Sequence, residues 1–133
     1  MDQVSYIKKR SNMGKLGEKI ATEYLKKIGL NFVKSNYHSR YGEIDIIFQD
    51  ENYIIFIEVK SRSKRQNDGI LSIDYRKRRK IVKTALLYRA INFSQKQPRF
   101  DVIEIFFDSF GDIFLKHIKN AFYVNGDYFD EIF

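Results

Sequence analysis

Hydrophobic residues follow two different periods along this chain, and the changes of period mark its elements. They recur at helical spacing over residues 14–29 and again over residues 73–93, which predicts two amphipathic helices. Elsewhere, short runs rich in isoleucine, phenylalanine and valine lie between polar turn residues, as is typical of strands. Strands are expected at residues 30–37, 43–48, 53–60, 99–107 and 113–118.

Both predicted helices have an apolar face and a recognisable boundary. Gly29 is expected to end the first helix, and Ser72 is expected to cap the amino end of the second. The apolar stripe of the first helix consists of Leu16, Ile20, Ala21, Tyr24, Leu25 and Ile28. The buried face of the second helix consists of Ile81, Val82, Ala85, Leu86 and Tyr88.

The order of these elements is one helix, three strands, one helix and two strands, which predicts an α/β fold. We expect a mixed central sheet of about five strands, flanked by helices, in a single domain. The domain is expected to span residues 13–120. A flexible basic arm over residues 1–12 would precede it, and an aromatic and acidic tail over residues 121–133 would follow.

Composition narrows the class of protein. Hydrophobic residues make up 44% of the 133 residues, enough for one core, and no segment is as long and apolar as a membrane span. The chain has no cysteine, which excludes disulfides and thiolate metal sites. We therefore expect a soluble, cytoplasmic protein that does not bind membranes.

Three charged residues interrupt two neighbouring apolar strands. Asp45 lies in the first of these strands, and Glu58 and Lys60 lie two positions apart, hence on one face, in the second. Residues 49–52 are polar and suit a hairpin turn, which would place Asp45 opposite the far end of the second strand. Because charges are rarely buried unless they are paired or bind a metal, this arrangement predicts a site for a hard cation.

The chemistry of these residues suits Mg²⁺ or Mn²⁺, which bind carboxylate, carbonyl and water oxygens. Asp45 and Glu58 would supply two carboxylates, and the backbone carbonyl of Val59 would supply a third oxygen. Lys60 would lie beside a metal-bound water, where its charge would either orient the nucleophile or stabilise negative charge in a transition state. The alternative is a purely structural ion pair between Glu58 and a neighbouring base.

Three further acids have two interpretations each. Glu18, at the margin of the first helix's stripe, either binds the metal or merely rims the core. Glu43, on the Asp45 face, is either an auxiliary acid of the site or a solvated residue at the start of its strand. Asp101 either approaches the site as an auxiliary acid or forms a structural ion pair with Arg99, and we favour the ion pair.

Positive charge is concentrated immediately downstream of the proposed site. Residues 60–89 contain eleven Lys or Arg and two Asp, a net charge of +9 in a chain whose total is +7. A local positive field beside an acidic site suits a polyanionic substrate, although basic residues also keep helices soluble. The candidate nucleic-acid contacts are Arg62, Lys64, Arg65, Arg76, Arg78, Arg79 and Lys80.

Several short motifs occur together in a fixed order. They are GKLGEKIA at residues 14–21, GEIDII at 42–47, FIEVKSR at 56–62, RFDV at 99–102 and NAF at 120–122. In this combination, over residues 10–122, the sequence resembles the YraN-like (UPF0102) family of bacterial proteins. The resemblance implies a restriction-endonuclease-like or Holliday-junction-resolvase-like fold, with a nuclease activity inferred from the site motif.

The resemblance also implies roles for individual residues. Asp45, Glu58 and Lys60 would form the catalytic core, with Glu18 as an added acid and Lys77 as an auxiliary base. Resolvase-like proteins often act as dimers, which leaves a homodimer open.

The leading hypothesis is a metal-dependent endonuclease that hydrolyses nucleic acid, with DNA favoured and branched DNA included. The first alternative is a non-catalytic nucleic-acid-binding protein that retains the nuclease fold. The second is an interaction subunit whose aromatic tail docks a partner.

Overall fold

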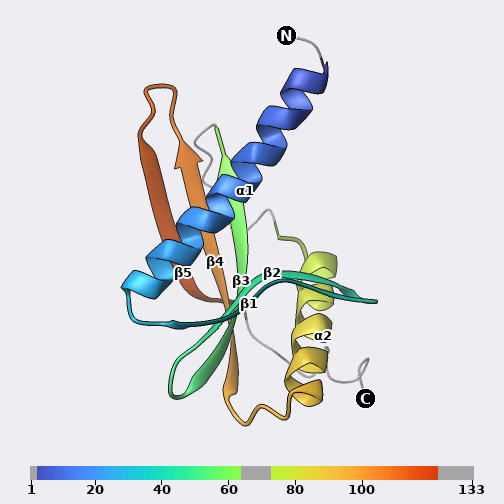
Figure 1. Ribbon diagram of the computed structural model, residues 1–133. Coiled ribbons are helices and arrows are strands. Elements are labelled where there is room, and N and C mark those ends of the chain that lie inside the picture. The colour runs from blue at the N-terminus through green and yellow to red at the C-terminus, as the bar shows by residue number, and fades with distance from the viewer. Residues whose placement is uncertain (1–2, 64–72, 123–133) are drawn as a thin grey trace.

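One five-stranded sheet lies between two helices (Figure 1). This computed structural model describes residues 3–63 and 73–122, with side chains from residue 12 onward. The elements are α1 (Gln3–Lys27), β1 (Asn31–Ser39), β2 (Gly42–Gln49), β3 (Tyr53–Arg62), α2 (Tyr75–Ile91), β4 (Gln97–Phe107) and β5 (Ile113–Phe122).

The strands lie in the sheet in the same order as in the chain. β3 and β4 are parallel because α2 carries the chain back between them, and the other neighbouring pairs are antiparallel. This mixed sheet with a helix on each face confirms the predicted α/β class and the predicted order of elements. Neither described helix has the length and hydrophobicity needed to cross a membrane.

Alternation along β3 divides the core into two layers. Ile54 and Phe56 pack with the buried face of α2, whereas Ile55 and Ile57 pack on the opposite side with α1. Burial of each such side chain contributes roughly 1.5–3 kcal/mol. The predicted buried face of α2 is confirmed in full, since all of its members are buried, namely Ile81, Val82, Ala85, Leu86 and Tyr88.

The predicted course of α1 was wrong in two respects. The helix begins at Gln3 rather than at residue 14, so residues 3–12, expected to form an arm, continue the helix. Its buried stripe is centred on Ala21 and Leu25, which are fully buried, whereas Leu16 and Ile28 are 46% exposed. The predicted end is confirmed, because Gly29 has a φ of 96° and the chain there closes a Schellman motif.

Smaller differences concern the other boundaries. α2 is capped by Asp74, whose side chain accepts the backbone N–H of Lys77, so the predicted start at residue 73 was two residues early. Ser72 lies outside the described residues, as do residues 64–71 and the part of the predicted tail from residue 123 onward. β5 continues to Phe122 rather than ending at residue 118, because its buried end packs with the α2 layer.

Candidate functional site

The site forms where β2 separates from β3. Their antiparallel pairing ends at Ile46 and Ile57, and one residue further on the Oδ2 atom of Asp45 accepts the backbone N–H of Val59 at 2.8 Å. Because it accepts this N–H, the side chain of Asp45 takes the place of a backbone carbonyl of the sheet and is fixed beside the end of β3. On the other side of β2, Asn36 of β1 has a φ of 51°, an irregular conformation within the strand.

Glu58 lies at the centre of a group of charges. Its Oε1 atom is 2.8 Å from Lys77 Nζ of α2 and 3.6 Å from Lys60 Nζ on the same face of β3. The side chain of Glu58 is only 11% exposed, so these are partly buried pairs rather than surface contacts. The predicted facing of Glu58 and Lys60 is confirmed.

The first helix brings Glu18 to the same place. The residue before it, Gly17, lies so close to β3 that a Cβ atom there would collide with the hydroxyl of Ser61. A hollow of about 280 Å³ at this contact is lined by Glu18 together with Asp45, Glu58, Val59, Lys60 and their neighbours. The five residues predicted to form the metal site and its base therefore lie around one hollow, on three different elements.

Two partly buried acids of the site have raised pKa values. Burial and the neighbouring charge of Glu58 raise the pKa of Asp45 from 3.8 to about 7, although the hydrogen bond from Val59 opposes the shift. Burial, followed by the charges of Glu43 and Glu58, also raises the pKa of Glu18. Catalytic and metal sites commonly contain two carboxyl groups that contact each other, one of which has a raised pKa.

The pKa values of the two lysines of the site are shifted in opposite directions. Burial, and then the neighbouring ammonium of Lys77, lower the pKa of Lys60. Burial is the largest single effect and acts to lower the pKa of Lys77, but the contacts with Glu58 and Lys60 and the charge of Asp45 together outweigh it, so the net shift is upward. Lys77 therefore keeps its proton more firmly than an ordinary lysine does, whereas Lys60 loses its proton more easily.

The donor set fits a divalent cation that keeps part of its water shell. Asp45 and Glu58 offer carboxylate oxygens. Because the N–H of Val59 points to β2, its carbonyl faces the same side of β3. Among the described residues, no three His, Asp or Glu side chains converge closely enough to hold a metal ion. Waters and substrate oxygens would complete the coordination, which is usual for Mg²⁺. Glu18 as a direct ligand stays a prediction.

The raised pKa of Asp45 predicts a pH dependence of stability in the metal-free protein. Folding raises this pKa. The contribution of the Asp45 carboxyl group to folding stability is therefore fully present below pH 3.8 and is lost as pH rises through about 7. We expect Asp45→Asn to remove this loss. At pH 8 the variant should be more stable than the wild type by roughly 1–3 kcal/mol, and at pH 5 by much less. Urea unfolding with a chelator measures both differences, and equal differences at the two pH values would refute the assignment.

Two auxiliary acids predicted for the site have pairing partners of their own. Glu43 is largely exposed and pairs with His38 at 3.3 Å, although its charge still acts on Glu18. Asp101 is buried in β4, where both of its oxygens accept from Arg99. The predicted ion pair with Arg99 is therefore present, and an auxiliary role of Asp101 at the site stays a prediction.

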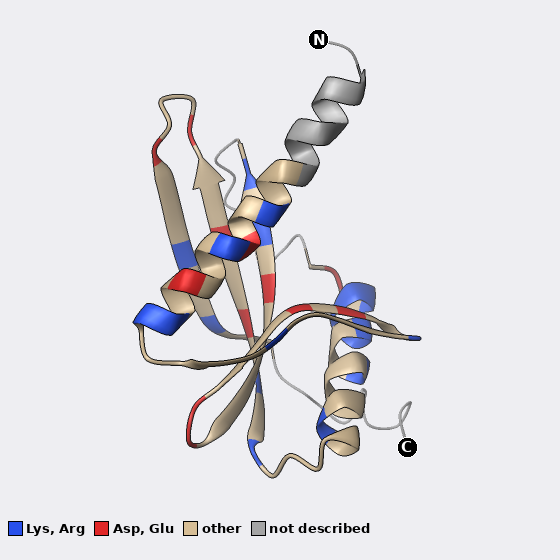
Figure 2. Cartoon of the chain, in the orientation of Figure 1, with Lys and Arg blue, Asp and Glu red and all other residues tan. Residues whose placement is uncertain are grey.

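The predicted nucleic-acid contacts divide into two kinds. Arg76 and Lys80 are exposed on the first turns of α2, where basic residues are concentrated in the sequence (Figure 2). Arg78 instead donates to the carbonyl of Ile73 and lies over the ring of Phe122 at 5.7 Å, so it supports packing. Arg79 lies over the Tyr75 ring and Arg62 ends β3, whereas Lys64 and Arg65 lie outside the described residues.

Sequence reasoning missed a buried polar network around Asp101. The Nε2 atom of His117 is 2.8 Å from Asp101 Oδ2, and its Nδ1 atom is 3.0 Å from the hydroxyl of Tyr24. Asn120 N–H also donates to Asp101. The network ties α1 to β4 and β5. The only signal in the sequence was a histidine within an apolar strand.

Comparison with known proteins is consistent with the motifs. The profile of the uncharacterised protein family UPF0102 matches residues 17–105. The chain is 43% identical over 118 residues to a UPF0102 protein of Caldanaerobacter subterraneus subsp. tengcongensis, which covers 85% of this chain and 96% of that protein. A UPF0102 protein of Clostridium kluyveri is 44% identical over 121 residues, with 85% and 95% covered.

The chain belongs to the UPF0102 family. The predicted resemblance to the YraN-like proteins is thereby confirmed. The matched region of this UPF0102 protein contains the full set of candidate site residues, from Glu18 on α1 to Lys77 on α2. It ends within β4, so the match includes the site but not β5.

Proposed function

We propose that this UPF0102 protein is a metal-dependent nuclease that hydrolyses phosphodiester bonds of nucleic acid, with DNA as the favoured substrate. One observation supports it above the others. Asp45, Glu58 and Lys60 meet in a single hollow at the point where two strands separate. Two acids and a base so placed match the requirements of metal-assisted phosphoryl transfer.

Each residue would have a distinct role. Asp45 and Glu58, with the carbonyl of Val59, would hold Mg²⁺ or Mn²⁺. The bound ion would polarise a phosphoryl oxygen and lower the pKa of a bound water. Lys60 would donate hydrogen bonds to the attacking water or to a phosphoryl oxygen, where negative charge develops in the transition state.

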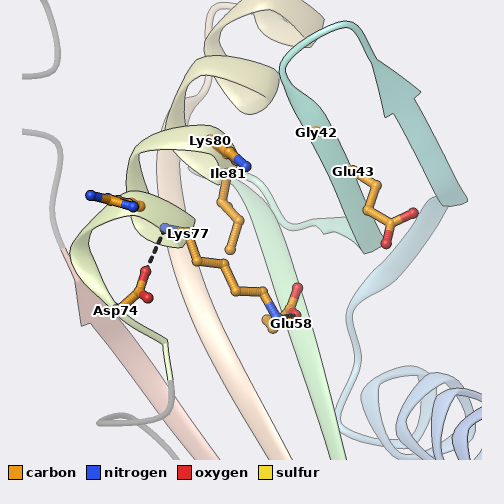
Figure 3. A pocket seen from close by; sticks show the side chains of 8 residues that line it. Gly42, Glu43, Glu58, Asp74, Lys77, Lys80 and Ile81 are labelled. Atoms are coloured by element: carbon orange, nitrogen blue, oxygen red, sulfur yellow. Dashed lines mark hydrogen bonds and ion pairs between the residues drawn. The ribbon is translucent and has the colours of Figure 1, made fainter.

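The basic first turns of α2 would bind the substrate. They lie beside the acidic hollow, and Lys77 links the two regions (Figure 3). A positive surface next to the metal site attracts a polyanion and binds backbone phosphates without reading bases. Substrate binding should therefore weaken strongly as salt is increased.

The test is a panel of duplex, single-stranded, flapped and four-way DNA, with RNA counterparts, assayed with Mg²⁺ or Mn²⁺. We expect cleavage of at least one substrate, and we expect Lys60→Met to slow it about 10²- to 10³-fold. Lys119→Met is the matched control, because Lys119 is an exposed lysine on β5. Failure to cut any substrate, or equal rates for the two variants, would count against the nuclease.

The second candidate is a nucleic-acid-binding protein without catalysis. It is favoured by the 2.8 Å pair between Lys77 and Glu58, which already neutralises one of the two proposed ligands. This candidate predicts salt-dependent binding of nucleic acid with no need for metal. Calorimetry with Mn²⁺ separates the two, since only the nuclease requires saturable binding that is lost in Glu58→Ala.

A further inference from the structure

Glu58 lies between two hollows rather than at the edge of one. On the α1 side is the hollow that also contains Asp45 and Lys60. On the other side, a hollow of about 430 Å³ lies between the β1–β2 hairpin and the first turns of α2. Lys77 lines only this second hollow and extends across it to Glu58 (Figure 3).

The backbone of Lys77 is fixed, but its side chain can leave Glu58. Asp74 caps α2 by accepting the Lys77 N–H at 2.9 Å, which holds the start of the helix in place. The side chain is 43% exposed and carries its charge on a flexible four-carbon stem. It can therefore swing away from Glu58 into the second hollow without a change in the helix.

A divalent ion and the Lys77 ammonium would compete for the same carboxylate. The ammonium already donates to Glu58 Oε1, and its positive charge would repel a cation held between Glu58 and Asp45. In the absence of a metal, the same ammonium offsets the repulsion between the two carboxyl groups. The contact therefore stabilises the metal-free site and opposes metal binding.

We propose that Lys77 is a placeholder cation, which neutralises Glu58 in the metal-free protein and withdraws into the second hollow when a divalent ion binds. This rests on the metal site of the proposed function. After withdrawal, the ammonium joins Arg76 and Lys80, which line the same hollow. Metal binding thereby increases the positive charge available to a phosphodiester backbone beside the site.

The test is calorimetric titration of the purified protein with Mn²⁺ alone, at pH 8, so that Asp45 is mostly ionised in every sample. We expect Lys77→Met to bind Mn²⁺ about tenfold more tightly than the wild type, because both the competition and the repulsion are removed. Lys119→Met is the matched control, since it removes the same charge from an exposed lysine of β5 that lines neither hollow, and it should leave the affinity unchanged. Lys77→Arg retains a paired cation and should behave as the wild type.

Each outcome decides the proposal. If Lys77→Met binds Mn²⁺ more tightly than the wild type and the control variant does not, the placeholder is supported. The same holds if Lys77→Met binds Mn²⁺ and the wild type shows no binding. Unchanged or weaker binding in Lys77→Met, or equal tightening in Lys119→Met, overturns the placeholder and leaves the metal site intact. Absence of saturable binding in both the wild type and Lys77→Met overturns the placeholder and the metal site together. Binding without cleavage of any substrate removes the nuclease and leaves the placeholder.

Discussion

Asp45→Asn is expected to slow nucleic-acid cleavage by on the order of 10³-fold or more while the fold is retained. Asparagine has nearly the same shape, and its amide oxygen can still accept the Val59 N–H that Asp45 accepts. What is lost is the negative charge, and with it one of two carboxylates that would hold the ion. Initial rates on the best substrate of the panel, at saturating Mg²⁺, measure the effect.

The control for this variant is a neutralised acid at the opposite end of the same hairpin. Glu51 is exposed in the turn between β2 and β3, so Glu51→Gln should cleave at the rate of the wild type. A circular dichroism spectrum shared by the three proteins would establish that the fold is unchanged. Wild-type rates for Asp45→Asn under these conditions would contradict the proposed chemistry.

Asp101→Ala is expected to destabilise the protein by about 3–5 kcal/mol, the largest change in stability that we predict. The Asp101 side chain is completely buried and accepts from Arg99, His117 and the N–H of Asn120. Its removal leaves the Arg99 charge, itself only 11% exposed, without its partner in the core. Urea denaturation at pH 7 measures the loss. Asp112→Ala, in an exposed turn, is the control and should change stability by less than about 0.5 kcal/mol.

The same network gives a pH dependence of the opposite sign to that of Asp45. The hydrogen bonds from His117, Arg99 and Asn120 outweigh burial, so the pKa of Asp101 is lowered from 3.8. Its contribution to stability is therefore present above pH 3.8 and is lost as pH falls further. A loss in Asp101→Ala as small as that of Asp112→Ala would show that the network does not support the fold.

The facing of the site residues could be predicted because it depends on local rules. Alternation along one strand places Glu58 and Lys60 together, and a short hairpin turn sets Asp45 opposite them. Both rules act over a few residues, and the structure follows them. The Gly29 cap and the buried face of α2 were predictable for the same reason.

Features that depend on how elements pack were not predictable. The stripe of α1 is centred on Ala21 rather than Leu16 because the sheet contacts the helix where Gly17 permits close approach, and glycine contributes nothing to a hydrophobic pattern. Lys77 comes close to Glu58 only because α2 packs against the sheet. His117 and Tyr24 are 93 residues apart, so no spacing rule could have paired them.

The site reduces the stability of the metal-free fold. Burying Asp45 next to Glu58 raises its pKa and costs free energy at neutral pH, and Lys77 offsets only part of that cost. A local arrangement that opposes stability in an otherwise consistent fold is typical of functional sites. The unfavourable pair of acids is therefore itself an argument for a bound cation.

The most direct test of this account is anomalous scattering from crystals of the protein soaked in MnCl₂. We predict a peak within coordinating distance of both the Asp45 and the Glu58 carboxylates, with the Lys77 ammonium displaced from Glu58. A well-ordered site with no peak between these carboxylates, and Lys77 still bound to Glu58, would contradict it.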